Sequence, residues 1–275
     1  TDSSISGSSS FGTASTTYGG SWQLTATPES NKVRTSNRTD QTTGAITAGS
    51  DLTLSPLFNS NGLVGYWKFD EGTGTSTVDS SGNNNPGSLI SGPTWTTSGC
   101  KVGNCLSFRG TSAYVTIGNP SNIQFDINTP FSVAFWMRLP ANTVNIGFAR
   151  KTATIHGLGW YTWSWTGNYK LSFTMYIPPS TSIGINSTMV ITDNNWHYAV
   201  ATYDGTSNRS GMKLYVDGII NATGTTAAIT GSIINTTNIT FSAAGGGGAG
   251  YLDDMRIYNR ALSAAEIYAL YSATR

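Results

Sequence analysis

A series of short strand-like runs between residues 63 and 258 constrains the fold of this chain more than any other feature. After the first run at residue 63, the runs recur at a spacing of roughly ten residues, with Gly, Asn and Asp between them. Asp204-Gly205 and Asp217-Gly218 are strong turn dipeptides. The pattern predicts an all-β sandwich. The later runs are 106–109, 114–117, 131–139, 160–165, 170–177, 196–203, 212–219, 239–241 and 251–258.

The first run and the last are expected to meet and close the domain. The first run alternates, with Val64, Tyr66 and Lys68 on one face, and turn-forming segments follow it. The last run leads into one helix, where Ser263 is the predicted cap and Glu266 completes a capping box. Three apolar residues then share one helix face: Ile267, Leu270 and Tyr271.

Six segments in this order carry a family resemblance. They read YWKFDEGTGTSTVDSSGNNNPGSL, SFRGTSAYVTIG, FSVAFWMRL, NNWHYAVATYDGT, MKLYVDGII and GYLDDMRIYNRALSAAEI. Together they resemble a laminin-G-like domain of the concanavalin A-like jelly-roll superfamily. The resemblance runs from about residue 63 to the C-terminus. It implies a jelly-roll domain over residues 62–275, with one short C-terminal helix.

Composition narrows the functional classes. Only 11% of the 275 residues are charged and the formal net charge is +1, against roughly 25% charged residues in an average domain. This balance offers no electrostatic basis for binding nucleic acid or an acidic membrane. No apolar stretch reaches the roughly 18 residues of a membrane span, and no secretory signal is visible. Ser, Thr, Asn and Gly must cover much of the surface, as in many extracellular β-proteins.

Residues 1–61 differ from the rest of the chain. The first seventeen are mostly Ser, Thr and Gly, which cannot form a core. The segments YGGSWQLTATPESNKV and GAITAGSDLTLSPL resemble the C-terminal part of bacterial type IV pilin-like and pseudopilin-like subunits. That family begins with a long apolar helix, which this chain lacks. The alternatives are a pilin-like segment and an ordinary flexible leader.

The two cysteines, Cys100 and Cys105, are separated by Lys-Val-Gly-Asn, which fits the arms of a tight turn. Such arms can bring the Cα atoms within disulfide range. The spacing is not that of a Cys-x-x-Cys redox motif, and nearby metal ligands are lacking. The spacing favours a disulfide over two free thiols, which implies an oxidising, extracytoplasmic setting.

Acidic residues near both ends of the domain are candidate ligands for a structural calcium ion, because carboxylate oxygens suit Ca²⁺. The resemblance implies a calcium site where the first-strand loop meets the last strand, at Asp79 and Asp253. The alternative has Asp79 capping a turn and Asp253 paired with a cation such as Arg256, without a metal. The predicted metal ligands are Asp70, Asp79, Asp253 and Asp254.

The sequence predicts no enzyme. Hydrolases on related jelly rolls place two carboxylates on one strand as Glu-x-Asp-x-x-Glu, and that motif is absent. The only glutamates, Glu29, Glu71 and Glu266, lie in the leader, a turn and a helix cap. His197 lies on a strand where the family commonly has His, and His156 lies beside a glycine. No Gly-x-Ser-x-Gly elbow occurs.

Aromatic residues around position 163 are the candidate ligand-binding group. Tyr161, Trp163 and Trp165 alternate on one strand face. Aromatic faces can stack on sugar rings, but large rings also fill the core of a sandwich. The sequence leaves a sugar platform and core packing open as alternatives for these residues.

The sequence as a whole predicts an extracellular surface-filament subunit that displays a laminin-G-like domain. The expected partners are other copies of the chain in a filament, and a glycan or surface protein. The alternative is a carbohydrate-binding accessory module of a secreted glycan-degrading enzyme. A structural Ca²⁺ ion is the one expected cofactor.

Overall fold

The computed structural model describes residues 60–109, 112–141, 146–153, 157–164, 169–243 and 250–274, together with strands β1 (Lys32–Val33) and β2 (Leu52–Thr53). The chain divides into two compact units, Thr1–Asn59 and Ser60–Arg275. In the first unit, β1 pairs antiparallel with β2, so that Lys32 lies opposite Thr53. Most of the predicted pilin-like segment lies outside the described residues.

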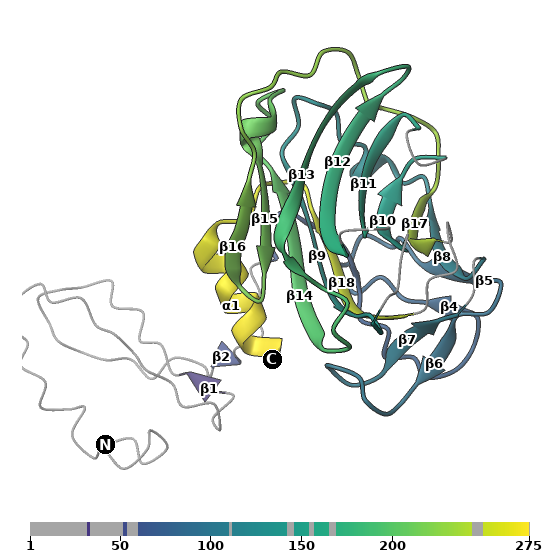
Figure 1. The fold of residues 1–275 in the computed structure, drawn as a ribbon. Helices are drawn as coiled ribbons and strands as arrows, with labels where there is room; N and C mark the ends of the chain where they lie inside the picture. The colour runs from purple at the N-terminus through teal and green to yellow at the C-terminus, as the bar shows by residue number, and fades with distance from the viewer. Residues whose placement is uncertain are drawn as a thin grey trace, which may run out of the picture. The chain divides into compact units, whose positions relative to one another are not determined.

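The second unit is a sandwich of two antiparallel sheets, as predicted (Figure 1). Sheet I has the order β16-β15-β14-β9-β18-β7-β6, and β3 also pairs with β18. Its strands are β3 (Leu63–Trp67), β6 (Thr94–Thr96), β7 (Cys105–Phe108), β9 (Phe131–Arg138), β14 (Trp196–Tyr203), β15 (Met212–Val216), β16 (Ile219–Thr223) and β18 (Gly250–Tyr258).

Sheet II has the order β13-β12-β11-β10-β17-β8-β5-β4. Four of its strands, β4, β5, β10 and β13, are not among the strands predicted from the sequence. Its strands are β4 (Ser76–Thr77), β5 (Gly87–Ile90), β8 (Tyr114–Gly118), β10 (Ile146–Lys151), β11 (Gly159–Ser164), β12 (Lys170–Ile177), β13 (Thr181–Val190) and β17 (Ile239–Ala243).

The first and last strands of the sandwich meet, as the sequence predicts. β3 pairs antiparallel with the end of β18, with Trp67 opposite Met255. The start of β18 pairs with β7, and its other edge pairs with β9. The register of β18 against β9 shifts between Asp253 and Arg256. Because this shift is a bulge in an interior strand, it re-aims the side chains around it.

The core lies between the two sheets and is rich in aromatic rings. Trp67 of sheet I meets Phe241 of sheet II edge to face, with ring centroids 4.9 Å apart. Phe135 and Phe148 stack across the same interface at 5.3 Å. Such pairs contribute beyond the area that they bury. The alternation of each strand turns its other side chains to the outer faces of the sheets.

Helix α1 (Ala264–Thr274) follows β18 and lies beside sheet I (Figure 1). The predicted capping box is present, since Ser263 N donates to Glu266 Oε2 at 2.8 Å and Glu266 N donates to Ser263 Oγ at 3.3 Å. Trp136 of β9 donates its indole N–H to Thr274 Oγ1 at 2.9 Å, which holds the last turn against the sheet. Among the described residues, no helix is long and apolar enough to cross a bilayer.

Two short 3-10 helices complete the described elements: η3 (Ser121–Ile123) and η4 (Arg209–Gly211). Ile123 of η3 is buried at the edge of the core, and Asn208 caps η4 through its side-chain oxygen. Neither segment was predicted, because each is a single turn within a loop.

Candidate functional site

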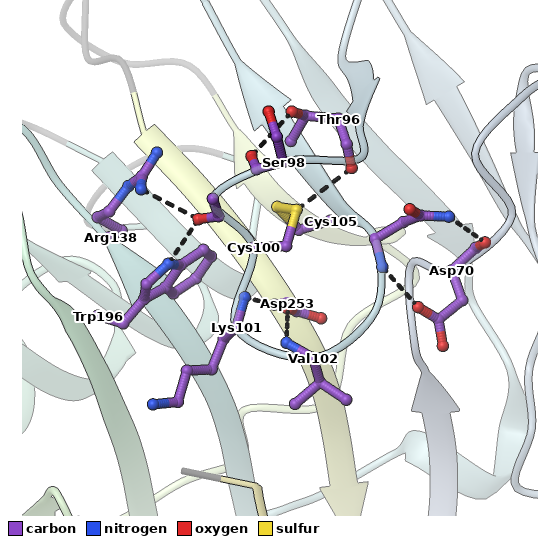
Figure 2. The surroundings of a disulfide bond; sticks show 12 residues. Asp70, Thr96, Ser98, Cys100, Lys101, Val102, Cys105, Arg138, Trp196 and Asp253 are labelled. Atoms are coloured by element: carbon purple, nitrogen blue, oxygen red, sulfur yellow. Dashed lines mark hydrogen bonds between the residues drawn. A yellow bond between two sulfur atoms is a disulfide. The ribbon is translucent and has the colours of Figure 1, made fainter.

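A loop between β6 and β7 is closed by the predicted disulfide of Cys100 and Cys105, whose Cα atoms lie 5.5 Å apart (Figure 2). Two acidic side chains hold this loop from opposite sides. Oδ2 of Asp253 accepts hydrogen bonds from the backbone N–H groups of Lys101 and Val102, at 3.1 and 2.8 Å. The covalent link and these bonds together fix the backbone of the loop on sheet I.

Asp70 anchors the far end of the same loop. Its Oδ1 accepts a hydrogen bond from the backbone N–H of Asn104 at 2.8 Å (Figure 2). The approach requires glycine at position 103, where φ is +60° and a β-carbon would lie 2.1 Å from Oδ1 of Asp70. The structure therefore brings two of the four predicted metal ligands, Asp70 and Asp253, to one loop.

Asp253 lies in an unusual electrostatic environment. Its side chain is fully buried. Burial raises the pKa of Asp253 to about 8; the charges of Asp254 and Asp70 add to the rise, and the backbone bonds from the loop oppose it. Within the described part of the chain, Oδ1 of Asp253 has no hydrogen-bond partner. A buried carboxylate is costly when it is incompletely paired, so a proton or a cation would stabilise this position.

Asp254 does not share the site of Asp253. It is the bulge residue of β18, with a φ of +54°. The bulge turns Asp254 toward Arg256, at 2.9 Å, and Arg256 also donates to the Tyr66 hydroxyl at 3.0 Å. Arg256 thus pairs with Asp254, whereas the metal-free alternative assigned it to Asp253.

Asp79 organises the loop between β4 and β5. Its Oδ1 accepts from the backbone N–H groups of Tyr66 and Ser81, each at 2.9 Å, and its Oδ2 accepts from Asn85 N at 3.0 Å. The bond from Ser81 N caps a turn, which is the role that the alternative without a metal predicted for Asp79. In the described ranges, no three His, Cys, Asp or Glu side chains converge as a metal site would require. The calcium ion therefore stays a prediction.

β11 places Tyr161 and Trp163 on one face, as predicted, with ring centroids 5.7 Å apart and edge to face. Trp160 faces the core, so the pair lies on the outer face of sheet II. The exposed fractions of Tyr161 and Trp163 are 3% and 7%, so almost none of the surface of either ring is open to solvent. Trp165, the third predicted member, lies outside the described residues.

An in-register row crosses sheet II through Tyr161. Tyr161 lies opposite Arg150 on one side and Thr174 on the other. Arg150 donates from Nε to Thr240 Oγ1 at 3.1 Å. Serine and threonine dominate the remainder of the row. Across the strands its members are Gly184, Thr174, Tyr161, Arg150, Thr240, Thr116, Ser88 and Ser76.

A family model described as "Concanavalin A-like lectin/glucanases superfamily" matches residues 109–268, more than half of the chain. The chain belongs to this superfamily. Solved structures similar to this concanavalin A-like chain include the binding domain of Paraclostridial Mosquitocidal Protein 1 (TM-score 0.64, 19% identity, 78% of this chain and 52% of that chain). No curated protein matches the chain at a significant level.

Two further similar structures are binding domains of botulinum neurotoxins. The domain of serotype C1 has a TM-score of 0.61 and 20% identity, covering 80% of this chain and 53% of that chain. The domain of neurotoxin DC in complex with SialylT has a TM-score of 0.61 and 19% identity, covering 78% and 52%. The concanavalin A-like chain thus spans about half the length of these structures, and the likeness concerns the fold.

Two of the three glutamates, Glu71 and Glu266, have structural roles in this concanavalin A-like domain. Glu71 Oε1 accepts from Thr77 Oγ1 at 2.9 Å and from Val78 N at 2.7 Å. Glu266 caps α1 and pairs with Arg260 at 2.8 Å. His197 lies on a strand, as predicted, and is buried there. Glu29 and His156 lie outside the described residues.

Three residues on the outer faces of the two sheets were not predicted as site residues: Arg150, Arg138 and Trp196. Arg150 lies on β10, a strand that the sequence did not indicate, so its position beside Tyr161 was not visible. Arg138 lies near the end of one predicted strand and Trp196 at the start of another, and only their register shows that they lie opposite each other. The signal that could have found them is alternation, counted outward from the core residues of each run.

Proposed function

We propose that residues 60–275 form a non-catalytic extracellular module that binds a carbohydrate on the outer face of sheet II. The row through Tyr161 and Arg150 carries this proposal. It places a guanidinium group and several hydroxyl groups beside the ring of Tyr161, a combination suited to the hydroxyl groups of a sugar. The partly exposed residues beside the rings, Arg150, Thr174 and Thr240, would make the first polar contacts.

The relatives support a binding role. Similar solved domains are described as binding domains of toxins, and the domain of botulinum neurotoxin DC is in complex with SialylT in one structure and with rat synaptotagmin II in another. These ligands belong to those proteins, of which this chain spans about half. Together with superfamily membership, they favour a glycan or a protein as ligand over a reaction substrate. The disulfide favours an oxidising setting outside the cytoplasm.

A glycan array followed by titration of each hit would test the proposal. Replacing Arg150 with Gln should weaken binding by about tenfold or more, because a hydrogen bond from a charged group would be lost. Lys213→Gln is a matched control, since Lys213 is an exposed cation on β15 of sheet I. Binding that is unchanged by Arg150→Gln and by Trp163→Phe, or an array without any hit, would contradict the proposal.

We also propose that the module is displayed by a surface filament through residues 1–61. The support is the pilin-like sequence of that segment and the antiparallel pairing of Lys32–Val33 with Leu52–Thr53. Two short strands are marginally stable alone, so they would need a neighbouring chain or helix to cover them. Deleting residues 1–61 should leave a folded monomer that no longer enters filaments. A full-length protein that is monomeric at every concentration would contradict this proposal.

A further inference from the structure

A second outer surface, on sheet I, carries a row in which one arginine lies between two aromatic rings. We call it the Arg138 row: Trp196 of β14, Arg138 of β9 and Tyr251 of β18 lie opposite one another in register. The guanidinium carbon of Arg138 lies 4.1 Å from the ring centroid of Tyr251 and 5.5 Å from that of Trp196. All three side chains are partly exposed.

The disulfide loop fixes this row in place. The carbonyl oxygen of Gly99 accepts from Arg138 Nη1 at 3.0 Å and from Trp196 Nε1 at 2.9 Å (Figure 2). Gly99 directly precedes Cys100, so the covalent link holds the acceptor. The planar guanidinium group is therefore oriented before any ligand arrives, which lowers the entropy cost of binding.

A second cation comes from the same loop. The ammonium group of Lys101 lies 4.3 Å from the ring centroid of Trp136, on the outer face of sheet I. Among the described residues, no carboxylate forms an ion pair with Arg138 or Lys101. Two positive charges are thus held against aromatic faces by cation–π attraction, which leaves N–H groups available to an anion.

We propose that the Arg138 row and Lys101 form a second binding site, for the carboxylate or sulfate group of an acidic glycan. Arginine binds such planar or tetrahedral oxyanions through two N–H groups, and the partly exposed rings of Trp196 and Tyr251 can contact the sugar that carries the anion. This site lies on sheet I and is independent of the row on sheet II.

The topology favours a glycan over an acidic peptide. β14, β9 and β18 are interior strands whose edges are paired with other strands. An extended peptide that adds to a sheet needs an open strand edge, and none is present at the Arg138 row. The surface offers fixed charges and ring edges instead, which suit a ligand whose anions sit on a rigid sugar.

The test uses the full chain and an array of matched glycans that share one neutral backbone, with uronate, sialate, sulfate or no acidic group. The acidic members should bind about tenfold or more tightly than the neutral member. Arg138→Gln should abolish this preference, and Lys101→Gln should reduce it. Arg209→Gln removes a partly exposed cation whose side chain donates to Thr225, and it should leave the preference unchanged.

Comparison of the carboxylate and sulfate members distinguishes the two anions. An equal affinity for acidic and neutral members would overturn the proposal, as would an acidic preference that survives both Arg138→Gln and Lys101→Gln. If Arg209→Gln lost the acidic preference equally, the attraction would be unspecific. If an acidic peptide bound more tightly than the acidic glycans, the ligand would be a protein. Either result contradicts the assignment. Since Lys101 lies on a loop, its variant keeps the test valid if Arg138→Gln does not fold.

Discussion

Nδ1 of His197 lies 2.8 Å from Oδ2 of Asp217, across the start of β14 and the β15–β16 turn. The other ring nitrogen lies 3.0 Å from Oδ1 of Asp193. Burial opposes the charged imidazole, but the hydrogen bonds and charges of Asp217 and Asp193 outweigh it and raise the pKa of His197 above its ordinary value of 6.5. His197 therefore links two turns most strongly when it is protonated.

The first prediction concerns pH. A group whose pKa is higher in the folded state adds stability below its unfolded pKa, and this stability is lost as pH rises through the folded pKa. His197→Gln should therefore reduce the free energy of unfolding most below about pH 6, with a shrinking difference above it. Urea unfolding of both proteins over a pH series measures this. A difference that does not vary with pH would mean that His197 acts only by packing.

The second prediction concerns Lys151, whose contribution to stability should change with pH in the opposite direction to that of His197. Lys151 is buried. Its Nζ donates a hydrogen bond to Asn119 Oδ1 and another, at 2.8 Å, to the carbonyl oxygen of Thr237. Burial lowers the pKa of Lys151 from 10.5 to about 8. Between these values the unfolded chain binds more protons, so this residue should make stability rise with pH. Lys151→Met should lack that rise when the two unfolding free energies are compared from pH 7.5 to 10.

The third prediction concerns the disulfide of Cys100 and Cys105. The loop is short, so reduction should lower the free energy of unfolding by only about 2 kcal/mol. Chemical unfolding with and without reductant measures the loss, and Cys100→Ser/Cys105→Ser should reproduce it. Thiol titration of the denatured, unreduced protein should find no free thiol; two free thiols would contradict the bond.

The fourth prediction concerns calcium. If the ion binds, its removal by a chelator should lower the melting temperature, and Asp79→Ala or Asp253→Ala should each abolish that difference. A ligand at a hundred times its Kd stabilises the folded state by about 2.7 kcal/mol. Asp204→Ala is a control, because Asp204 caps a separate turn through Thr206. An unchanged melting curve for the chelated wild type would exclude the site.

The fifth prediction concerns the start of α1. Ser263→Ala removes the hydroxyl that accepts from Glu266 N and donates to its carboxylate. The loss of such a cap should lower the free energy of unfolding by about 1 kcal/mol. Glycine at position 263 should cost less than alanine, because glycine is a better cap residue. Thermal unfolding of the wild type and the two variants measures the order of their stabilities.

Local patterns predicted much of the fold. Most of the alternating runs, the turn at Asp217-Gly218 and the capping box at Ser263 formed as expected, because each depends on neighbours in the sequence. The predicted run 212–219 instead ends at Val216, because the turn at Asp217-Gly218 separates β15 from β16. β13 was missed because Gly184 and Asn186 interrupt its apolar pattern. β10 was missed because a bulge between Gly147 and Ala149 breaks its alternation.

The candidate surfaces depend on long-range register, which local patterns do not give. The pairing of Arg150 with Tyr161 and that of Arg138 with Tyr251 join strands that are distant in sequence or unpredicted. The opposite environments of Asp253 and Asp254 depend on one bulge. Alternation places the neighbours Asp253 and Asp254 on opposite faces of a strand. It does not predict which of the two carboxylates pairs with Arg256, and in the structure this is Asp254.

The position of β18 has a consequence for synthesis. This strand ends the sandwich in sequence, yet it lies inside sheet I between β9 and the pair β3 and β7. While a ribosome is still making residues 250–258, β3 has no described partner and β9 has one open edge. Open apolar strand edges attract other chains. A nascent or truncated chain that stops before residue 250 should therefore aggregate, and the domain can close only when almost all of it has been made.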